Sequence, residues 1–357
     1  MRIEPFSIAV EDAVLDDLRT RLERTRWPSP SPGEPWAQGA DVASLRELVA
    51  YWRDGFDWRA RERRLNAFDQ FVADVDGVRV HFVHVRRGGV PLVLTHGWPS
   101  AFTEGVGLVD LLGGFDLVIP SLPGYGFSTR PDVCTTPDVA RLWHTLLQGL
   151  GYERYGACGG DWGAAVTTYM AVQQPERMLG IHISALDNSP EPKPPFTDAE
   201  RRFMEAVGHW DVTQRGYSTI QSTQPQTLAY GLTDSPTGLA AWIAEKWRSW
   251  ADPDCPIDRD FLLELITLYW VSDTIATANR DYLDNYRAGT PRLDDYVTVR
   301  TAIANFHHQR ISEGVLPREW AERSYNVERF TDMPRGGHFA AAEAPDLLAA
   351  DIAAFFG

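Results

Sequence analysis

Short apolar segments alternate with helical segments from residue 91 onward, and this alternation restricts the chain to few folds. Residues 91–95 and 116–120 are continuously apolar, which is typical of strands buried on both faces of a sheet. A third such run, at residues 155–158, lies between helical patterns at residues 137–150 and 164–173. The alternation predicts an α/β fold, with a mostly parallel sheet covered by helices on both faces.

A helical segment interrupts this alternation after the strand that we expect at residues 179–185. A proline-rich stretch at residues 187–195 ends the regular pattern, and mostly helical sequence continues to about residue 293. Strands are expected again at residues 296–302 and 327–333. An insertion of this kind should lie as a lid above the carboxyl ends of the strands, where such folds bind ligands.

The chain before the alternating region is helical and aromatic at first, and then contains a β-hairpin. Residues 71–75 and 78–85 flank Asp76-Gly77, a pair typical of hairpin turns. We therefore expect four parts: an N-terminal extension over residues 1–85, the first part of the core over 86–187, a helical cap over 188–295, and the second part of the core over 296–357.

The composition excludes several classes of partner. Lys+Arg 34 against Asp+Glu 49 gives a net charge of −15 with His neutral, which disfavours nucleic acid and anionic membranes. No apolar run approaches the ~20 residues of a membrane span, and the N-terminus lacks a signal-peptide pattern. The widely spaced Cys134, Cys158 and Cys255 indicate a reducing, cytoplasmic location and no metal site. Only Lys193 and Lys246 are lysines, an arginine bias that suggests a GC-rich bacterial genome.

The segment Gly-Gly-Asp-Trp-Gly at residues 159–163 follows an expected strand and precedes an expected helix. That is the setting of a nucleophile elbow, a sharp turn whose flanking glycines leave room for a strained central residue. A glycine-rich turn with a capping aspartate would have the same sequence, and this alternative stays open. The position between strand and helix favours the elbow.

The central residue of this segment is Asp161 rather than serine, and this decides the class of reaction. A serine that attacked a saturated carbon would form an ether, which water does not readily cleave. A carboxylate forms an ester, whose carbonyl can then be hydrolysed. An aspartate nucleophile therefore favours an epoxide or an alkyl halide as substrate and disfavours an ordinary esterase reaction.

Two further segments fit such a site. The sequence His-Gly-Trp-Pro at residues 96–99 follows a strand, in the loop that supplies one oxyanion-hole N–H in folds with this elbow. The residue after the nucleophile supplies the other, so the expected donors are the backbone N–H groups of Trp98 and Trp162. His338 lies between the last strand and the last helix, where the base is needed. We interpret His96 as structural.

Further motifs occur along nearly the whole chain, and they are Phe6-Ser7-Ile8, Thr25-Arg26-Trp27-Pro28, Phe56-Asp57-Trp58-Arg59, Asp234-Ser235-Pro236-Thr237-Gly238 and Arg335-Gly336-Gly337-His338-Phe339. Together with the segments at residues 96–99 and 159–163, they resemble those of the microsomal-type epoxide hydrolases. The resemblance implies an α/β-hydrolase fold with a helical cap and an N-terminal extension. It also implies hydrolysis of an epoxide to a vicinal diol through a covalent aspartyl ester, without a cofactor or a metal.

The resemblance further implies two cap tyrosines that hydrogen-bond the epoxide oxygen. The matching positions are Tyr217, in Gly-Tyr-Ser-Thr-Ile-Gln, and Tyr282, in Arg-Asp-Tyr-Leu-Asp-Asn. Ring opening creates an alkoxide, which a phenol can stabilise or protonate. We expect the substrate to lie between these tyrosines and Trp98 and Trp162.

The acid partner of His338 departs from the family pattern, which places a Glu or Asp a few residues after the penultimate strand. Glu313 is the nearest carboxylate here, although it is one residue out of register when counted from Trp320. Asp187, after an earlier strand, is a second candidate, because the acid need only reach His338 in space. A site without any acid would hydrolyse the ester slowly.

Three other functions stay open beside an epoxide hydrolase. A haloalkane dehalogenase shares the Asp, the His and the oxyanion hole, but it needs halide donors such as tryptophans in place of paired tyrosines. A tailoring enzyme would use a nucleophile other than water, which the irregular acid region favours. A non-catalytic receptor is disfavoured by the intact pair of Asp161 and His338.

The aromatic-rich cap suits a bulky apolar epoxide, such as a secondary metabolite. Both a monomer and a homodimer are compatible with the sequence.

Overall fold

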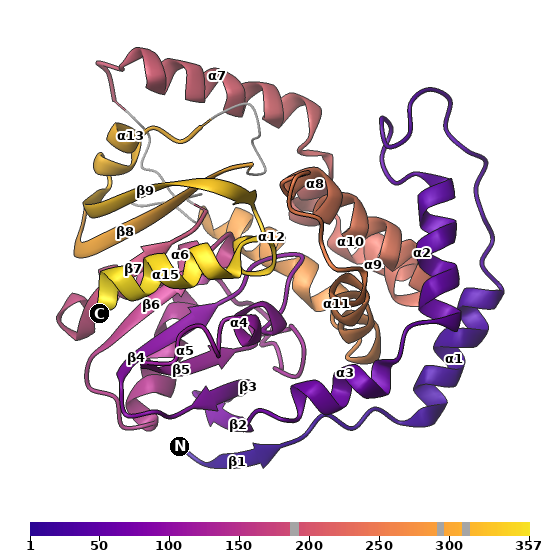
Figure 1. The fold of residues 1–357 in the computed structure, drawn as a ribbon, viewed down its shortest axis with the longest axis horizontal. Coiled ribbons are helices and arrows are strands. Elements are labelled where there is room, and N and C mark those ends of the chain that lie inside the picture. Colours follow the sequence, from indigo (N-terminus) through magenta and orange to yellow (C-terminus); the bar gives the residue numbers. More distant parts are fainter. Residues whose placement is uncertain (186–192, 291–295, 309–314) are drawn as a thin grey trace.

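The computed structural model describes residues 1–185, 193–290, 296–308 and 315–357 (Figure 1). Within these residues nine strands form one sheet in the order β1-β2-β3-β5-β4-β6-β7-β8-β9. The first three pairs in this order are antiparallel and the remaining pairs are parallel. The strands are β1 (Ile3–Phe6), β2 (Gln70–Val75), β3 (Val78–Val85), β4 (Val90–Thr95), β5 (Phe115–Pro120), β6 (Tyr155–Gly159), β7 (Met178–Ile183), β8 (Val297–His308) and β9 (Tyr325–Gly337).

The central strands match the apolar runs of the sequence. All six residues of β5 are buried, and β4 pairs with it in parallel with Leu92 beside Leu117. The predicted hairpin is confirmed as β2 and β3, joined by Asp76 and Gly77, whose φ angles are 51° and 83°. Two consecutive positive φ angles are what a tight two-residue hairpin turn requires. The strand β1, by contrast, was not expected in a region that the sequence predicts to be helical.

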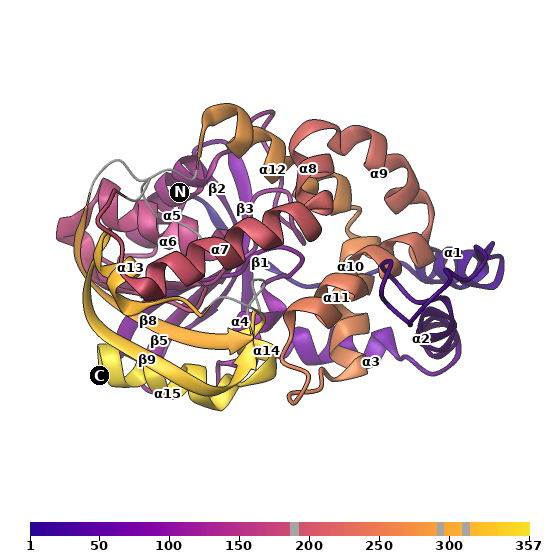
Figure 2. The ribbon, with the colours of Figure 1, turned by 90° about the horizontal axis from the view of Figure 1, so that it is seen from above.

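Helices cover both faces of the sheet, as predicted. In Figures 1 and 2, α4 (Thr103–Gly107) and α15 (Pro345–Phe356) lie on one face, and α5 (Thr136–Gly149) and α6 (Trp162–Gln173) lie on the other. The helix α5 begins with a capping box between Thr135 and Asp138. The short η1 (Pro175–Arg177), α13 (Arg318–Glu322) and α14 (Ala340–Glu343) complete the core.

The cap consists of six helices in the described residues between β7 and β8; in Figure 2 the first of them crosses the core, and the others lie beside it. They are α7 (Asp198–Thr213), α8 (Gly216–Thr223), α9 (Pro225–Asp234), α10 (Pro236–Trp250), α11 (Arg259–Val271) and α12 (Ile275–Ala288). In the described part of the chain, no single helix is long and apolar enough to cross a membrane. The pair α11 and α12, bent by 86°, passes that test of length and composition only when the two are taken together.

The N-terminal extension packs on the outer side of the cap. Its helices are α1 (Asp12–Glu23), α2 (Val42–Asp54) and α3 (Trp58–Leu65); α1 and α2 contact α10, and α3 contacts α11. The fully buried Glu264 of α11 pairs with Arg61 and Arg64 of α3 at 2.8 and 2.9 Å. The indole of Trp52 donates a hydrogen bond to Thr267 Oγ1 at 2.9 Å. These contacts fasten the extension to the cap.

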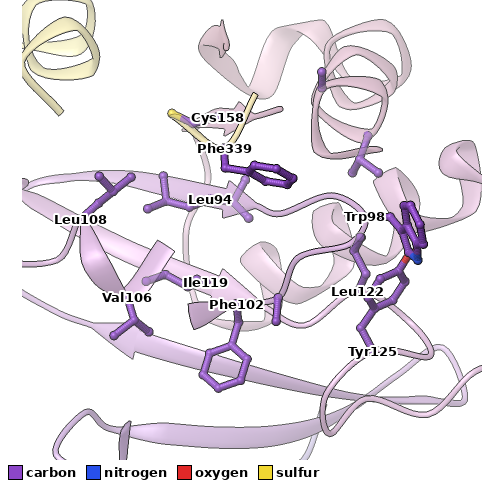
Figure 3. Close-up of a cluster of buried hydrophobic side chains, with 14 of the residues drawn as sticks. Leu94, Trp98, Phe102, Val106, Leu108, Ile119, Leu122, Tyr125, Cys158 and Phe339 are labelled. Carbon is purple, nitrogen blue, oxygen red and sulfur yellow. The ribbon is translucent and has the colours of Figure 1, made fainter. Parts of the chain in front are cut away.

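An apolar cluster supports the loop that follows β4. Figure 3 shows Leu108 and Val106 near one end of this cluster, Leu94 along β4, and Trp98 where the loop leaves the sheet. The side chain of Trp98 is fully buried. The core therefore packs against the side chain of Trp98 and supports the loop at the carboxyl end of the strands.

Candidate active site

Asp161 lies in a sharp turn between β6 and α6, with φ 53° and ψ −127°. This is a strained conformation for a residue with a side chain, of the kind found at functional sites. The flanking glycines permit it, since a Cβ on Gly159 would lie 2.3 Å from the carbonyl oxygen of Gly163. A Cβ on Gly163 would lie 2.0 Å from the carbonyl oxygen of Thr95. The turn has the geometry of a nucleophile elbow.

The carboxylate of Asp161 does not cap α6 but faces two groups on other loops. Its Oδ1 accepts a hydrogen bond from the backbone N–H of Trp98 at 2.9 Å. Its Oδ2 lies 3.5 Å from Nε2 of His338. This arrangement favours the elbow over the alternative of a capping aspartate.

Trp98 and Trp162 lie where oxyanion-hole donors are expected. The backbone N–H of Trp98 already points at the carboxylate. Trp162 is the first residue of α6, and N–H groups in the first turn of a helix have no partner within the helix. Close approach of the first loop depends on Gly97, because a Cβ there would lie 2.5 Å from Asp161 Cβ.

His338 follows β9 directly and precedes α14, as predicted. Its backbone N–H donates to the carbonyl oxygen of Trp250 at 3.0 Å. Its ring packs against Trp250 and Phe339, both with centroids 5.0 Å away. The imidazole is buried and fixed beside Asp161. Its expected acid partners, Glu313 and Asp187, lie outside the described residues.

The two predicted tyrosines, Tyr217 of α8 and Tyr282 of α12, meet the two tryptophans in one aromatic group. The ring of Tyr217 stacks on Trp98 at 5.3 Å with an interplanar angle of 6°. The ring of Tyr282 lies edge-on to Trp98 at 5.6 Å and to Trp162 at 5.0 Å. The two tyrosine rings are 5.8 Å apart. The structure thus brings together all four residues that were expected to bind substrate.

Cap helices also fix the loop after β4 by hydrogen bonds. The indole of Trp98 donates to Asn279 Oδ1 at 3.1 Å, and the indole of Trp247 donates to the carbonyl oxygen of Pro99 at 2.8 Å. The hydroxyl of Tyr269 donates to the carbonyl oxygen of Ser100 at 2.8 Å. The helices α10, α11 and α12 therefore each hold one residue of this loop.

A buried ion pair ties α12 to the core next to Tyr282. The guanidinium of Arg130, which is almost fully buried, contacts the carboxylate of Asp281 and lies 2.7 Å from that of Asp284. Breaking such a pair typically costs about 3–5 kcal/mol, because a charge is left uncompensated. We therefore regard Arg130 as the main anchor of the helix that carries Tyr282.

His96 has a structural place in the same loop, in agreement with its interpretation from the sequence. Its Nδ1–H donates to the carbonyl oxygen of Gly97 at 2.9 Å, and its Nε2 accepts from the N–H of Leu122 at 3.1 Å. Burial lowers the pKa of His96 to about 4. The ring is therefore neutral at pH 7, and both of its nitrogens are occupied.

A cavity of about 60 Å³ lies beside the catalytic candidates, and Asp161, His338 and Glu104 all line it. Burial raises the pKa of Glu104 to about 8, so this carboxyl is neutral at pH 7. No sequence motif marks Glu104, which stands in the short helix α4. Among residues 1–185, 193–290, 296–308 and 315–357, no group of three His, Cys, Asp or Glu residues is arranged to hold a metal ion.

Comparison with known proteins gives the same family in sequence and in structure. A family model described as "Epoxide hydrolase N terminus" matches residues 3–105, and one described as "alpha/beta hydrolase fold" matches residues 90–215. The chain is 39% identical to a putative epoxide hydrolase of Stigmatella aurantiaca, over 98% of this chain and 84% of that protein. It is 31% identical to epoxide hydrolase 1 of Sus scrofa, over 99% of this chain and 88% of that protein.

Two solved structures are similar over nearly their whole length. The structure of Aspergillus niger epoxide hydrolase has a TM-score of 0.89 and 30% identity, covering 99% of this chain and 96% of that chain. The juvenile hormone epoxide hydrolase of Bombyx mori has a TM-score of 0.87 and 28% identity, covering 100% of this chain and 93% of that chain. The resemblance inferred from the sequence motifs is thereby confirmed.

Proposed function

The chain belongs to the epoxide hydrolase family, and from this premise we propose that it opens a small-molecule epoxide to a vicinal diol through a covalent ester on Asp161. The observation that carries the proposal is the placement of the two carboxylate oxygens. One oxygen accepts the backbone N–H of Trp98, and the other faces His338. The ring of Tyr217 packs against Trp98 and that of Tyr282 against Trp162, the two residues proposed to supply the oxyanion-hole N–H groups.

In the first half-reaction, Oδ2 of Asp161 attacks an epoxide carbon, because Oδ1 is already held by Trp98 N–H. The new bond joins Oδ2 to that carbon, and the bond from the same carbon to the epoxide oxygen breaks. The alkoxide that results receives hydrogen bonds from the phenols of Tyr217 and Tyr282, and then a single proton from one of them, which becomes a tyrosinate. Preorganised donors of this kind stabilise charge that develops in the transition state.

In the second half-reaction, Nε2 of His338 accepts a proton from a water molecule while the water oxygen attacks Cγ of the ester. Negative charge moves to Oδ1, which is held by the backbone N–H of Trp98 and is also proposed to accept from the backbone N–H of Trp162. The bond between Cγ and Oδ2 then breaks, and Oδ2 takes the proton held on Nε2 of His338 as the diol leaves. The proton of the hydroxyl added to Cγ returns through solvent to the tyrosinate, which restores both the Asp161 carboxylate and the phenol. Glu313 is the proposed acid that orients His338, and Asp187 is the second candidate.

Several features support the setting of this reaction. We propose residues 188–295 as the cap domain, residues 86–187 and 296–357 as the two parts of the core, and residues 1–85 as the N-terminal extension. The aromatic lining supports a bulky apolar epoxide as substrate. Cys134, Cys158 and Cys255 are free thiols, which supports a cytoplasmic location. The indole N–H of Trp98 is bonded to Asn279, so the halide site of a dehalogenase would lack one of its expected donors.

The test follows the oxygen atoms in a single turnover. With enzyme in excess over styrene oxide, in water enriched in heavy oxygen, the first diol should be unlabelled, because its new oxygen is Oδ2. The peptide that contains Asp161 should gain the label. The Asp161→Asn variant is the control and should acquire no label through turnover. Label in the diol from the first turnover, with none on the peptide, would contradict the covalent route and make His338 a base for direct attack by water.

A further inference from the structure

Lys246 of α10 is a buried cation beside the aromatic group of the site. Its side chain is 8% exposed, and its Nζ lies 4.6 Å from the ring centre of Tyr217 and 5.8 Å from that of Trp250. Glu245 Oε2 lies 2.5 Å from the ammonium, on a side chain that is 22% exposed. Burial of an ammonium is costly unless it is compensated. The aromatic faces and one carboxylate provide that compensation here.

The buried cation is a lysine, although arginine supplies nearly all of the positive charges in this chain. Only Lys193 and Lys246 are lysines among 34 basic residues. An ammonium is a compact point charge with a narrow stem, whereas a guanidinium is a broad planar group. The ammonium of Lys246 therefore fits over one ring of a crowded aromatic group, where Trp98 is already stacked on Tyr217.

The charge of Lys246 acts differently on the resting and the reacting states of Tyr217. In the resting state the ammonium attracts the π face of a neutral phenol, an interaction of modest size. During ring opening, the phenol gives its proton to the alkoxide and negative charge grows on Tyr217. The attraction to a cation a few ångströms away then becomes that of two opposite charges. An interaction that strengthens toward the transition state raises the rate of that step.

We propose that Lys246 is a positioning residue that activates Tyr217 electrostatically and thereby accelerates ring opening. This inference rests on the proposed function. The proton moves from the phenol oxygen to the alkoxide oxygen, and Lys246 keeps all of its own protons. Because Nζ of Lys246 lies over the ring of Tyr217, 4.6 Å from its centre, its effect should pass mainly through Tyr217.

The experiment measures ester formation directly. His338→Gln serves as the parent, in which the ester accumulates, and its formation from styrene oxide is followed by intact-protein mass spectrometry after rapid quenching. Lys246→Met, which keeps the length and apolar volume of the side chain, should slow ester formation by roughly 10- to 100-fold, less than the ~10²–10³ for loss of a direct donor. Lys246→Gln is the second variant if the methionine variant does not fold.

Two comparisons separate an effect through Tyr217 from a general effect on the fold. In a Tyr217→Phe background, Lys246→Met should change the rate by less than about threefold, whereas in a Tyr282→Phe background its full effect should persist. Arg248→Met is the matched control, because Arg248 is exposed on the same helix and lies over Trp36 at 5.0 Å. It should leave the rate unchanged.

The outcomes are distinguishable from failure of the proposed function. A parent that forms no ester would contradict the aspartyl-ester mechanism before Lys246 is considered. If the parent forms ester and Lys246→Met does not slow it, the inference is wrong. An equal slowing in the Tyr217→Phe and Tyr282→Phe backgrounds would also overturn it, since Lys246 would then act independently of Tyr217.

Discussion

Substitution of Gly97 by alanine tests whether the position of the Asp161 carboxylate sets the rate. The new methyl group would lie 2.5 Å from Asp161 Cβ and 2.6 Å from Oδ1. Ordinary van der Waals contact begins at about 3.4 Å, so one of the two loops must move by roughly 1 Å. The elbow has little freedom to move, because Gly163 already packs against the backbone of Thr95.

The expected loss is large because the displaced group is the nucleophile. A shift of about 1 Å in a reacting group can cost ~10²-fold in rate, which corresponds to about 2.7 kcal/mol in the activation free energy. The assay is again the formation of the ester on Asp161 in the His338→Gln parent. We expect Gly97→Ala to slow this step by about two orders of magnitude, with folding retained in a thermal melt.

Gly208→Ala provides the control for an added methyl group. Gly208 is exposed within α7, and a Cβ there meets nothing within 4 Å. Its replacement should raise the free energy of unfolding by up to ~1 kcal/mol through helix propensity, without any effect on ester formation. If Gly97→Ala formed the ester at the parental rate, the close contact would not fix the carboxylate and the reasoning would be refuted.

Two further predictions concern the acid of the triad and a buried carboxyl. Glu313→Gln should slow ester hydrolysis by up to ~10⁴-fold in single-turnover kinetics while Asp187→Asn changes little; the reverse result would assign the acid to Asp187. For Glu104, burial raises the pKa to about 8 from an ordinary value of 4.5, so the wild type should lose stability as the pH rises through this interval. Glu104→Gln should remove this dependence, which is at most about 5 kcal/mol. The prediction would be contradicted if the free energy of unfolding, measured with denaturant at pH 5 and pH 8, changed equally in the wild type and the variant.

The sheet core could be predicted from the sequence because of its burial. Strands that are covered on both faces must be continuously apolar, so β4 and β5 are recognisable without any neighbour. The strand β1 was missed because it has only four residues, two of them exposed. Its hydrogen bonds to β2 do not depend on an apolar pattern.

The last two strands extend beyond their predicted ends, because their pairing continues past the apolar residues. The prediction gave residues 296–302 and 327–333, whereas β8 is Val297–His308 and β9 is Tyr325–Gly337. The two strands pair along nearly their whole length, and main-chain hydrogen bonds stabilise the polar ends. The sequence also predicts a last helix over residues 344–356, and the structure has α15 at Pro345–Phe356.

The parts of the site differ in how visible they are in the sequence. Asp161 and His338 lie at the carboxyl ends of strands, where local sequence alone indicates chemistry. The tyrosines were found only through the family resemblance, because nothing local distinguishes them from the other tyrosines. Lys246 and Glu104 were not found, since their neighbours come from distant segments of the chain.

The placement of these residues divides the proposed cycle between two parts of the molecule. The core supplies Asp161, the loop of Trp98 and His338, the groups to which the proposed cycle assigns hydrolysis of the ester. The groups that act on the epoxide oxygen, Tyr217 and Tyr282, come from the cap. Ring opening therefore requires that the cap and the core keep their relative position to within a fraction of an ångström. Ester hydrolysis, in contrast, depends mainly on the core.

The contacts between cap and core are suited to that requirement. Buried charges tie α12 to the core through Arg130, and the cap residues Asn279, Trp247 and Tyr269 each hold one residue of the Trp98 loop. Because this loop also donates the N–H that holds Oδ1 of Asp161, the nucleophile and the tyrosines are positioned against the same short segment. A cap that shifted would carry the loop with it, so the spacing between nucleophile and proton donors would change less than the spacing between the domains as a whole.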